Sequence, residues 1–445
     1  MSKWENVRIG DFLYHREGTY KPDNPKVRDL TRLEKIDFGG NIHLAKKKSK
    51  TNMIIIKPGD LVISGINVSK GAVAIYQGSE DISATIHFSS YKFDKEKIDI
   101  DFFKLFLKSS SFIELLKEQV KAGIKTEIKP KHILPLIIHL PDKKEQTIIV
   151  NWFNKKLKKI YKLQDEINYQ ELLLKHFHQS ILQEAIEGKL TADWRKEHPE
   201  LIIGENSAES LLKKIKEEKE HLIRENKIKK QKSFPPIAEK EKPFGLPEGW
   251  SFSRIGDLGL INPRNYLSDE LKVSFVPMNL ISEGYGVRPS FLEKKWNEIK
   301  IGYTHFQDGD IALAKITPCF ENSKCCIFRS LINGYGAGTT ELHVLRPITG
   351  IVNSEYIYLF LKTASFLKKG EKLMKGTAGQ KRVPLNYFEE GIIPIPPNHE
   401  QVIIINRINH MLNKINILEK QINNQERLSE QLTQSLLREA FEQSN

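Results

Sequence analysis

The hydrophobic positions of this chain form two long stretches with helical periodicity, one in the middle of the sequence and one at its end. Apolar residues recur at steps of three and four from Phe153 to Ile181, and again from Ile408 to Leu436. Such steps place side chains on one face of an α-helix, and a sustained repeat of them is typical of a coiled coil. At about 1.5 Å per residue, each helix is expected to be on the order of 60 Å long.

The two stretches begin in nearly the same way. "LPDKKEQTIIV" introduces the first and "IPPNHEQVIII" the second. In each, a capping residue (Asp142 or Asn398) is followed three residues later by Glu145 or Gln401, which is the spacing of a capping box. A proline directly before it marks the end of an extended segment. We therefore expect helices in residues 142–190 and 397–445.

Two such helices in one chain most simply pair with each other, and we expect them to run antiparallel. The positions assigned to the seam are Ile160, Leu163, Ile167 and Gln170 on the first helix, and Ile415, Leu418, Ile422 and Gln425 on the second. Gln170 and Gln425 occupy matching central positions. A polar pair there would fix the register, and the alternative is two exposed glutamines.

The segments before the helices also repeat in the same order. "RIGD" occurs twice, "KPGDLVIS" matches "QDGDIALA", and "FFKLFLKSSSF" matches "YIYLFLKTASF". Short runs rich in β-branched residues flank each Gly-Asp, which indicates a turn between two strands. An amphipathic helix and a short apolar strand follow. The expected fold class is α+β, with two pseudo-symmetric domains, residues 1–141 and 248–396, joined by two long antiparallel coiled-coil helices.

The region between the repeats, residues 191–247, has a different composition. It is rich in Lys, Glu and Pro, and "SAESLLKKIKEEKEHLIREN" is expected to form a helix with Leu212, Ile215 and Leu222 on one side. We interpret this region as a linker: a solvated or partner-bound helix followed by a flexible stretch.

Charge and cysteine content narrow the function classes. Lys and Arg number 69 against 56 Asp and Glu, giving a net charge of +13, which favours a polyanionic partner such as DNA, RNA or an acidic membrane surface. A lysine-rich composition without such a partner is the alternative. The chain has 3 cysteines, which disfavours a disulfide framework, and their spacing disfavours zinc. We find no membrane-length apolar run and expect a cytoplasmic protein.

With these motifs in the observed order, the chain resembles the specificity (S) subunits of type I restriction–modification systems. The resemblance rests on "LPEGW" followed by "IGD", on the two Gly-Asp turns, on the two Pro-x-x-x-Glu-Gln helix entries and on the central "EGKLTADWR". The first repeat departs from the pattern, because it lacks Pro-Glu-Gly before Trp4 and its "GIKTEIKP" lacks a glutamine.

The resemblance implies a subunit without a catalytic centre. Such a subunit binds one bipartite, asymmetric site on double-stranded DNA, with one half-site for each target-recognition domain. It holds two methyltransferase (M) subunits, which methylate adenine N6 with S-adenosylmethionine. Restriction (R) subunits, which use ATP and Mg²⁺, join for translocation and cleavage. The paired helices would then set the gap between half-sites, and inserting whole helical turns would lengthen it.

Basic and amide side chains near the repeated turns are the candidates for DNA contact. Contacts with phosphates position a protein on DNA, and contacts with base edges give sequence specificity. The guanidinium of Arg382 is suited to two hydrogen bonds with guanine, and the amide of Gln380 to two with adenine. The alternative is that most of these side chains are solvated surface residues. The candidates are Lys70, Lys125 and Lys129 in the first domain, and Lys315, Lys324, Gln380, Lys381 and Arg382 in the second.

Two other function classes remain as alternatives. An adenine methyltransferase would carry an Asn/Asp-Pro-Pro-Tyr/Phe loop and a glycine-rich cofactor loop, whereas "INPRNY" and "GYGAGTT" match neither pattern. A coiled-coil scaffold whose globular units bind protein or carbohydrate fits the helices as well. The net charge and the paired domains favour DNA over it.

Overall fold

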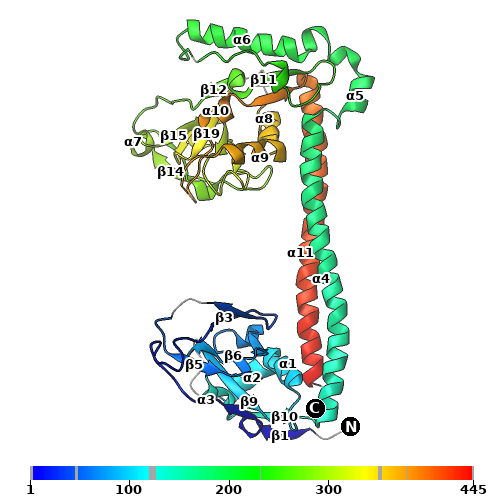
Figure 1. Ribbon diagram of the computed structural model, residues 1–445. Helices are drawn as coiled ribbons and strands as arrows, with labels where there is room; N and C mark the ends of the chain where they lie inside the picture. Colours follow the sequence, from blue (N-terminus) through cyan, green and yellow to red (C-terminus); the bar gives the residue numbers. More distant parts are fainter. Residues whose placement is uncertain are drawn as a thin grey trace. The chain divides into compact units, whose positions relative to one another are not determined.

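A computed structural model describes residues 4–45, 49–119, 127–230, 232–348, 353–377 and 379–442 of the chain. Its contacts divide the chain into two compact units. One comprises Met1–Gln170 with Gln421–Asn445, and the other comprises Glu171–Lys420. Each unit holds one of the repeated α+β domains together with parts of both long helices (Figure 1).

The first unit contains three small sheets. An antiparallel pair of β1 and β10 joins the two ends of the domain, and it lies beside two four-stranded sheets with the orders β2-β9-β6-β7 and β4-β3-β8-β5. Among the strands described in this unit, the only parallel contact is between β3 and β8. The strands are β1 Glu5–Arg8, β2 Leu13–His15, β3 Arg32–Ile36, β4 Ile42–Ala45, β5 Met53–Ile56, β6 Leu61–Ser64, β7 Val73–Ile75, β8 Ile82–Thr85, β9 Phe88–Phe93 and β10 Ile137–Leu140.

The second unit repeats this topology strand for strand. Its β11 pairs with β20, and its four-stranded sheets have the orders β12-β19-β16-β17 and β14-β13-β18-β15. The α+β class and the internal repeat predicted from the sequence are confirmed. The strands are β11 Ser251–Arg254, β12 Gly259–Ile261, β13 Lys272–Val276, β14 Leu292–Lys295, β15 Thr304–Gln307, β16 Ile311–Ala314, β17 Cys325–Ile327, β18 Tyr335–Gly338, β19 Leu342–Pro347 and β20 Ile392–Ile395.

Short helices pack against the sheets of each domain. The aromatic residues of α1 and α8 are buried, as their helical spacing predicted, and Phe102 and Tyr356 are fully enclosed. The helices of the first domain are α1 Ile100–Lys108, α2 Ser110–Gln119 and α3 Pro130–Ile133. Those of the second are α7 Trp296–Ile299, α8 Ser354–Leu361, α9 Ala364–Leu373 and α10 Leu385–Glu389.

Both predicted Gly-Asp turns connect two strands. Gly59 lies between β5 and β6 with φ 84°, and Gly309 lies between β15 and β16 with φ 91°. A positive φ of this size favours glycine, because a Cβ would clash with the backbone. The aspartate after each glycine, Asp60 or Asp310, turns its side chain inward and is buried.

The two long helices are α4, Lys143–Ile186, and α11, Asn398–Glu442. Asp142 caps α4 as predicted, because its Oδ1 accepts a hydrogen bond from the backbone N–H of Glu145 at 2.9 Å. At the equivalent entry the α-helix already includes Asn398. The glutamine after each entry is buried, and Gln146 and Gln401 each donate to a carbonyl just before the helix at 2.9 Å.

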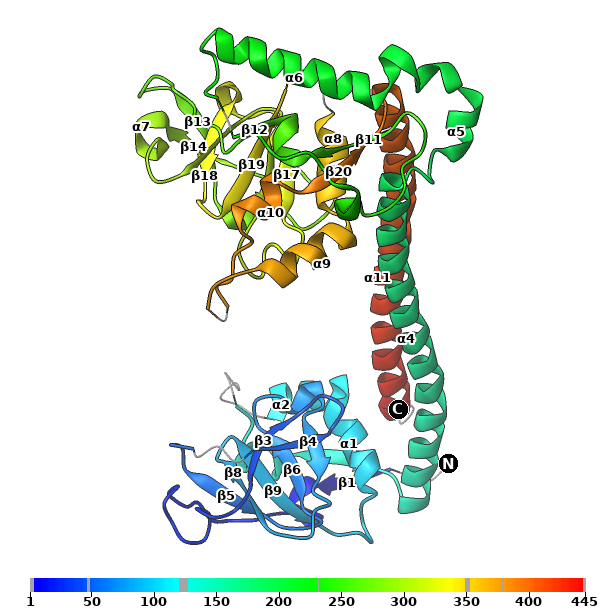
Figure 2. The same cartoon turned by 45° about the horizontal axis from the view of Figure 1, so that its top comes forward.

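Within each unit the two helices pack antiparallel and lie side by side in both views (Figures 1 and 2). In the first unit the start of α4, with Val150 and Phe153, shares a hydrophobic core with Leu437 and Phe441 near the end of α11. In the second unit the end of α4 shares a core with the start of α11, including Leu182 and Ile408. The helix ends are therefore part of the hydrophobic cores of the two repeated domains.

Burial differs among the residues that were predicted to pair the two helices. Ile160, Ile167, Ile415 and Ile422 are buried. Leu163 and Leu418 are 41% and 44% exposed, and Gln425 is exposed as well, so these three residues lie outside the seam. Gln170 donates to Glu166 on its own helix at 3.1 Å rather than to a partner glutamine. The sequence carries apolar side chains beside the seam as well as in it, and spacing alone did not separate the two stripes.

The central region packs its helix α6 onto the second unit, which corrects the prediction of a solvated or partner-bound helix there. It forms α5, Ala192–Glu197, and α6, Ala208–Arg224. Leu211 and Ile215 of α6 belong to the core of that unit, together with Trp250. The short apolar stripe of α6 is thus covered by the domain that follows it in sequence.

Candidate nucleic-acid interface

Each recognition domain holds a buried arginine–aspartate pair at its Gly-Asp turn. Asp60 accepts two hydrogen bonds from Arg16, at 2.6 and 2.7 Å, and Asp310 accepts from Nε and Nη2 of Arg346 at 2.9 Å. The arginines come from different places: Arg16 directly follows β2, whereas Arg346 lies within β19. The arginine thus comes from a different position in each domain. The ion pair and the fold around it repeat here, although the sequence does not.

Burial raises the pKa of both carboxylates, but the net pKa shifts have opposite directions. For Asp310, burial raises the pKa against the opposing effect of the Arg346 guanidinium. For Asp60, burial is the largest single contribution and raises the pKa, but hydrogen bonds from Arg16, Ser90 and the backbone of Lys57 outweigh it, and the pKa is lowered. Both pairs anchor the strand β6 or β16 that leads into a loop carrying candidate basic residues.

The first of these loops carries Lys70. It lies at the end of a single turn of 3₁₀-helix, Val68–Lys70, between β6 and β7, and its side chain is exposed. Its ammonium lies 5.7 Å from the centre of the Phe38 ring, which belongs to the turn between β3 and β4. Lys70 is therefore accessible to a phosphate, and its contact with DNA stays a prediction.

The remaining candidates of the first domain are less uniform. Lys129 is exposed at the start of α3, where its ammonium lies 3.7 Å from Glu127. That carboxylate also contacts His87 at 3.1 Å, so the position is not purely basic. Lys125 falls outside the residues that the structure describes.

Lys315 and Lys324 lie at the two ends of the loop between β16 and β17. The backbone of Lys315 bonds to Glu341 and Val383, and that of Lys324 bonds to Cys319 and Ala314. Both side chains are half-buried. Lys324 lines a shallow cleft of about 460 Å³ together with Arg288 and Glu283.

The segment with Gln380, Lys381 and Arg382 is exposed and bridges to the β16–β17 loop, because Thr317 N–H donates to the Lys381 carbonyl at 2.9 Å. The Arg382 guanidinium is already paired: its Nε and Nη2 donate to the two carboxylate oxygens of Glu341 at 2.9 and 2.8 Å. The fork predicted for guanine is occupied by a carboxylate in this structure. A contact with DNA would require Arg382 to exchange one acceptor for another.

Arg288 is a further candidate for DNA contact that was not predicted from the sequence. This residue lies in the long connection between β13 and β14, beside Lys324 in the cleft. The connection in the first domain spans only residues 37–41, so the repeat offered no counterpart from which to align it. The glycine-rich "EGYGVRPS" around it was the available signal, because such a tract indicates an irregular loop.

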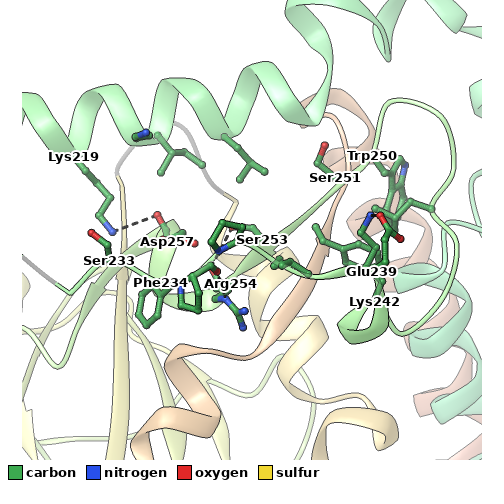
Figure 3. A pocket seen from close by; sticks show the side chains of 18 of the residues that line it. Lys219, Ser233, Phe234, Glu239, Lys242, Trp250, Ser251, Ser253, Arg254 and Asp257 are labelled. Atoms are coloured by element: carbon green, nitrogen blue, oxygen red, sulfur yellow. Dashed lines mark hydrogen bonds and ion pairs between the residues drawn. The ribbon is translucent and has the colours of Figure 1, made fainter.

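A groove of about 1300 Å³ lies between α6, the segment before β11, and β11 itself (Figure 3). Lys219 crosses it and donates to the carbonyls of Gly256 and Gly259 at 3.0 and 3.1 Å. Arg254 ties the preceding segment down through the Pro235 carbonyl at 3.0 Å and the Glu241 carboxylate at 3.2 Å. These basic groups hold the groove together and are not free for DNA.

Three motifs of the family resemblance meet in one buried cluster. The fully buried carboxylate of Glu400, from the α11 entry, accepts a hydrogen bond from Trp250 Nε1 at 2.8 Å and from Thr191 Oγ1 at 2.5 Å. Arg195 forms an ion pair with the same carboxylate. Trp250 belongs to "LPEGW", whereas Thr191 and Arg195 belong to "EGKLTADWR". The cluster therefore locks the central region and the helix entry onto the second domain.

The described residues offer no group of three or more His, Cys, Asp or Glu that would hold a metal ion. Cys325 and Cys326 are buried on β17, and burial raises the pKa of the Cys325 thiol to about 12. Among the described helices, none has an apolar stretch that would reach across a bilayer.

Comparison with known proteins agrees with this geometry. The family model described as "Type I restriction modification DNA specificity domain" matches residues 247–425. The chain is 46% identical over 265 residues to the EcoAI specificity subunit of Escherichia coli, covering 59% of this chain and 44% of that protein. It is 24% identical over 389 residues to the EcoKI specificity subunit of strain K12, covering 87% and 75%. The chain thus spans less than half of the EcoAI relative.

The fold has a counterpart among solved structures. A chain from a study of the "complex assembly" and "conformational transition of the type I R-M system" matches over 99% of this chain and 97% of that one. The TM-score is 0.60 at 14% sequence identity, so this likeness supports the fold alone. Residues 247–425 thus match the DNA specificity domain of type I restriction–modification systems, and the chain is similar to the specificity subunits of such systems.

Proposed function

We propose that this protein is the DNA specificity subunit of a type I restriction–modification complex. It binds a bipartite, asymmetric site on double-stranded DNA, and each recognition domain reads one half-site. The observation that carries the proposal is the strand-for-strand repeat of the domain, combined with loops that differ in length and in basic residues. DNA sequence is recognised by side chains that contact base edges. Two domains with the same fold but different loops are therefore suited to recognise two different half-sites.

In this proposal the chain contributes recognition and assembly, and the chemistry belongs to its partners. Two M subunits bring S-adenosylmethionine and methylate adenine N6. R subunits bring ATP and Mg²⁺ for translocation and cleavage. The paired helices α4 and α11 serve as a spacer and as a surface for the M subunits.

Candidate DNA contacts in the described residues are the accessible side chains on the loops of each domain. Lys70 and Lys129 are exposed in the first domain, and Gln380, Lys381 and Arg382 are exposed in the second. Arg288 and Lys324 share a cleft in the second domain. The net charge of +13 supports attraction to DNA at long range.

Methylome sequencing tests the proposal directly. The gene is expressed with its cognate M subunits in a host without other adenine methylation, and modified bases are mapped by single-molecule sequencing. We expect N6-methyladenine in one motif made of two specified halves with an unspecified gap. The absence of methylation above the level of an M-only control, or one uninterrupted motif, would reject the proposal.

Retention of DNA distinguishes the proposed specificity subunit from the alternative, a scaffold that binds protein or carbohydrate. A specific DNA complex should weaken steeply with salt, with a log–log slope of about −0.9 for each phosphate neutralised.

We infer further that the isolated subunit binds weakly and that M subunits clamp the duplex. A gel shift with and without M subunits tests this, and equal affinity in both would reject the clamp.

A further inference from the structure

A buried lysine holds two loops of the second domain together. Lys362 directly follows α8 and is 2% exposed. Its ammonium donates to the carbonyls of Glu283 and Gly284, at 2.8 and 3.0 Å, and to the carbonyl of Ser323 at 2.8 Å. The first two carbonyls belong to the β13–β14 loop (residues 277–291) and the third to the β16–β17 loop (residues 315–324). An ammonium has three donors, so all of them are used.

Further contacts hold these loops, one between the two loops and one between the β13–β14 loop and α8. Asn322 Nδ2 donates to the Glu283 carboxylate at 2.9 Å, and Gly286 N–H donates to the hydroxyl of Tyr358 at 3.0 Å. The Tyr358 ring lies 5.4 Å from the Lys362 ammonium. Ser323 has a φ of 56°, which is uncommon for a residue with a side chain and presents its carbonyl to Lys362.

The loops fastened in this way carry the basic side chains of the cleft. Arg288 comes from the β13–β14 loop and Lys324 from the β16–β17 loop, and both line the same hollow of about 460 Å³. Neither loop is part of a sheet at this point, so their relative position depends on contacts such as those of Lys362.

The first domain has a lysine at the equivalent place. Lys108 ends α1 in "LFLKSS", where the second domain has "LFLKTA". A Cβ on Gly71, in the β6–β7 loop, would lie 2.8 Å from Lys108 Cε and 2.6 Å from the carbonyl of Phe38. Phe38 lies in the β3–β4 turn, so Lys108 also occupies the junction of the two corresponding loops. Lys70, the candidate of the first domain, lies on one of them.

We propose that Lys362 is a positioning residue for DNA recognition, which fixes Arg288 and Lys324 side by side to contact one half-site, and that Lys108 does the same for the other half-site. This inference rests on the proposed function. Lys362 does not touch DNA in this scheme. It acts through the loops, so its loss should change which sequence is read rather than whether the domain folds.

The test uses the complete S subunit with its M subunits and compares wild type with Lys362→Met and Lys108→Met. Folding is checked by co-purification with M subunits and by thermal unfolding. In the methylome of Lys362→Met we expect one half of the motif to become degenerate while the other half is retained, with DNA binding weaker by about ten-fold. Lys108→Met should have the reciprocal effect on the other half. Lys300→Met, which changes a half-buried lysine paired with Asp269, is the control and should leave both halves intact.

The outcomes separate the inference from the function it rests on. If the wild type shows no bipartite methylation, the proposed function fails. If the wild type does and Lys362→Met retains both halves with unchanged affinity, or if both lysine variants alter the same half, the inference is wrong. Should Lys362→Met fail to fold, the surface variants Arg288→Ala and Lys324→Ala decide. If both variants make the same half of the motif degenerate, the inference is supported, and if the motif is unchanged, the inference is overturned.

Discussion

Arg346 and Asp310 form a forked ion pair inside the second recognition domain, and Asp310 is 1% exposed. Arg346 Nη2 also donates to Asn265 Oδ1 at 2.9 Å, so the guanidinium joins three parts of the chain. Arg16 and Asp60 form the corresponding pair in the first domain. Each pair fixes the turn before the strand, β6 or β16, that leads into a candidate DNA loop.

Replacing Arg346 by Met should destabilise the second domain, because it leaves a buried carboxylate without its partner. Breaking a buried pair in this way costs about 3–5 kcal/mol. Hydrogen exchange should show faster exchange in β12, β16 and β19, with the strands of the first domain unaffected. Arg329→Met is the control: its exposed pair with Glu355 should contribute less than about 1 kcal/mol. Equal effects of the two variants would contradict the role of burial.

The cluster around Glu400 should show energetic coupling between the α11 entry and the central region. Glu400→Gln and Arg195→Met each remove the charge of one member of this buried ion pair, and each should cost about 3–5 kcal/mol. In the double variant both charges are gone, so its loss should be smaller than the sum of the single losses. A double-mutant cycle on urea unfolding of the second unit measures this. Strict additivity would mean that the two residues act independently.

Much of the architecture was predictable from the sequence, because a repeat supplies two readings of the same structure. The Gly-Asp turns, the helix entries and the long helices follow from local chemistry that occurs twice. The docking of α6 was missed, since its buried residues Leu211 and Ile215 occupy a short stripe that fits a solvated helix equally well. The pairing of Arg382 with Glu341 was also missed, because these residues are 41 positions apart and spacing carries no signal at that distance.

Burial in the seam should decide which helix residues matter for stability. Ile415 is 2% exposed in the core of the second unit, whereas Leu418 on the same helix is 44% exposed. Truncation of a buried isoleucine to alanine costs about 2–5 kcal/mol, so Ile415→Ala should be strongly destabilising. Leu418→Ala should stay within about 0.5 kcal/mol. Chemical denaturation of the two variants compares them directly, and a larger effect of Leu418→Ala would restore the register predicted from the sequence.

Stability of the second domain should fall in mild acid because of His343. Burial lowers the pKa of His343 from 6.5 to about 4, although its Nε2 contact with the Val383 carbonyl opposes the shift. Since the folded state resists protonation, the unfolded state binds more protons between these values. The contribution of His343 to the stability of the domain is therefore complete above pH 6.5 and is lost as the pH falls to about 4.

The difference of 6.5 and 4 corresponds to a loss on the order of 3 kcal/mol, at about 1.4 kcal/mol for each pKa unit. Thermal unfolding of His343→Gln, which retains a donor but does not titrate in this range, should show a flatter dependence between pH 7 and pH 4. If wild type and variant lose stability in parallel over this range, His343 is not the group responsible.

Arg382 should be held back from DNA by Glu341, and releasing it should strengthen binding. The carboxylate occupies both ends of the guanidinium fork, so contact with a phosphate or guanine requires that pair to open. Glu341→Gln removes the competing charge and should raise the affinity of the complex for its site several-fold. Arg382→Ala should weaken binding and, if the contact is to a phosphate, reduce the log–log salt slope by about 0.9. In the double variant Glu341 no longer matters, so the affinity should match that of Arg382→Ala. Salt titrations of a fluorescent duplex measure all three variants. A gain in affinity from Glu341→Gln that persists without Arg382 would show that Glu341 repels DNA directly and does not act by holding the arginine.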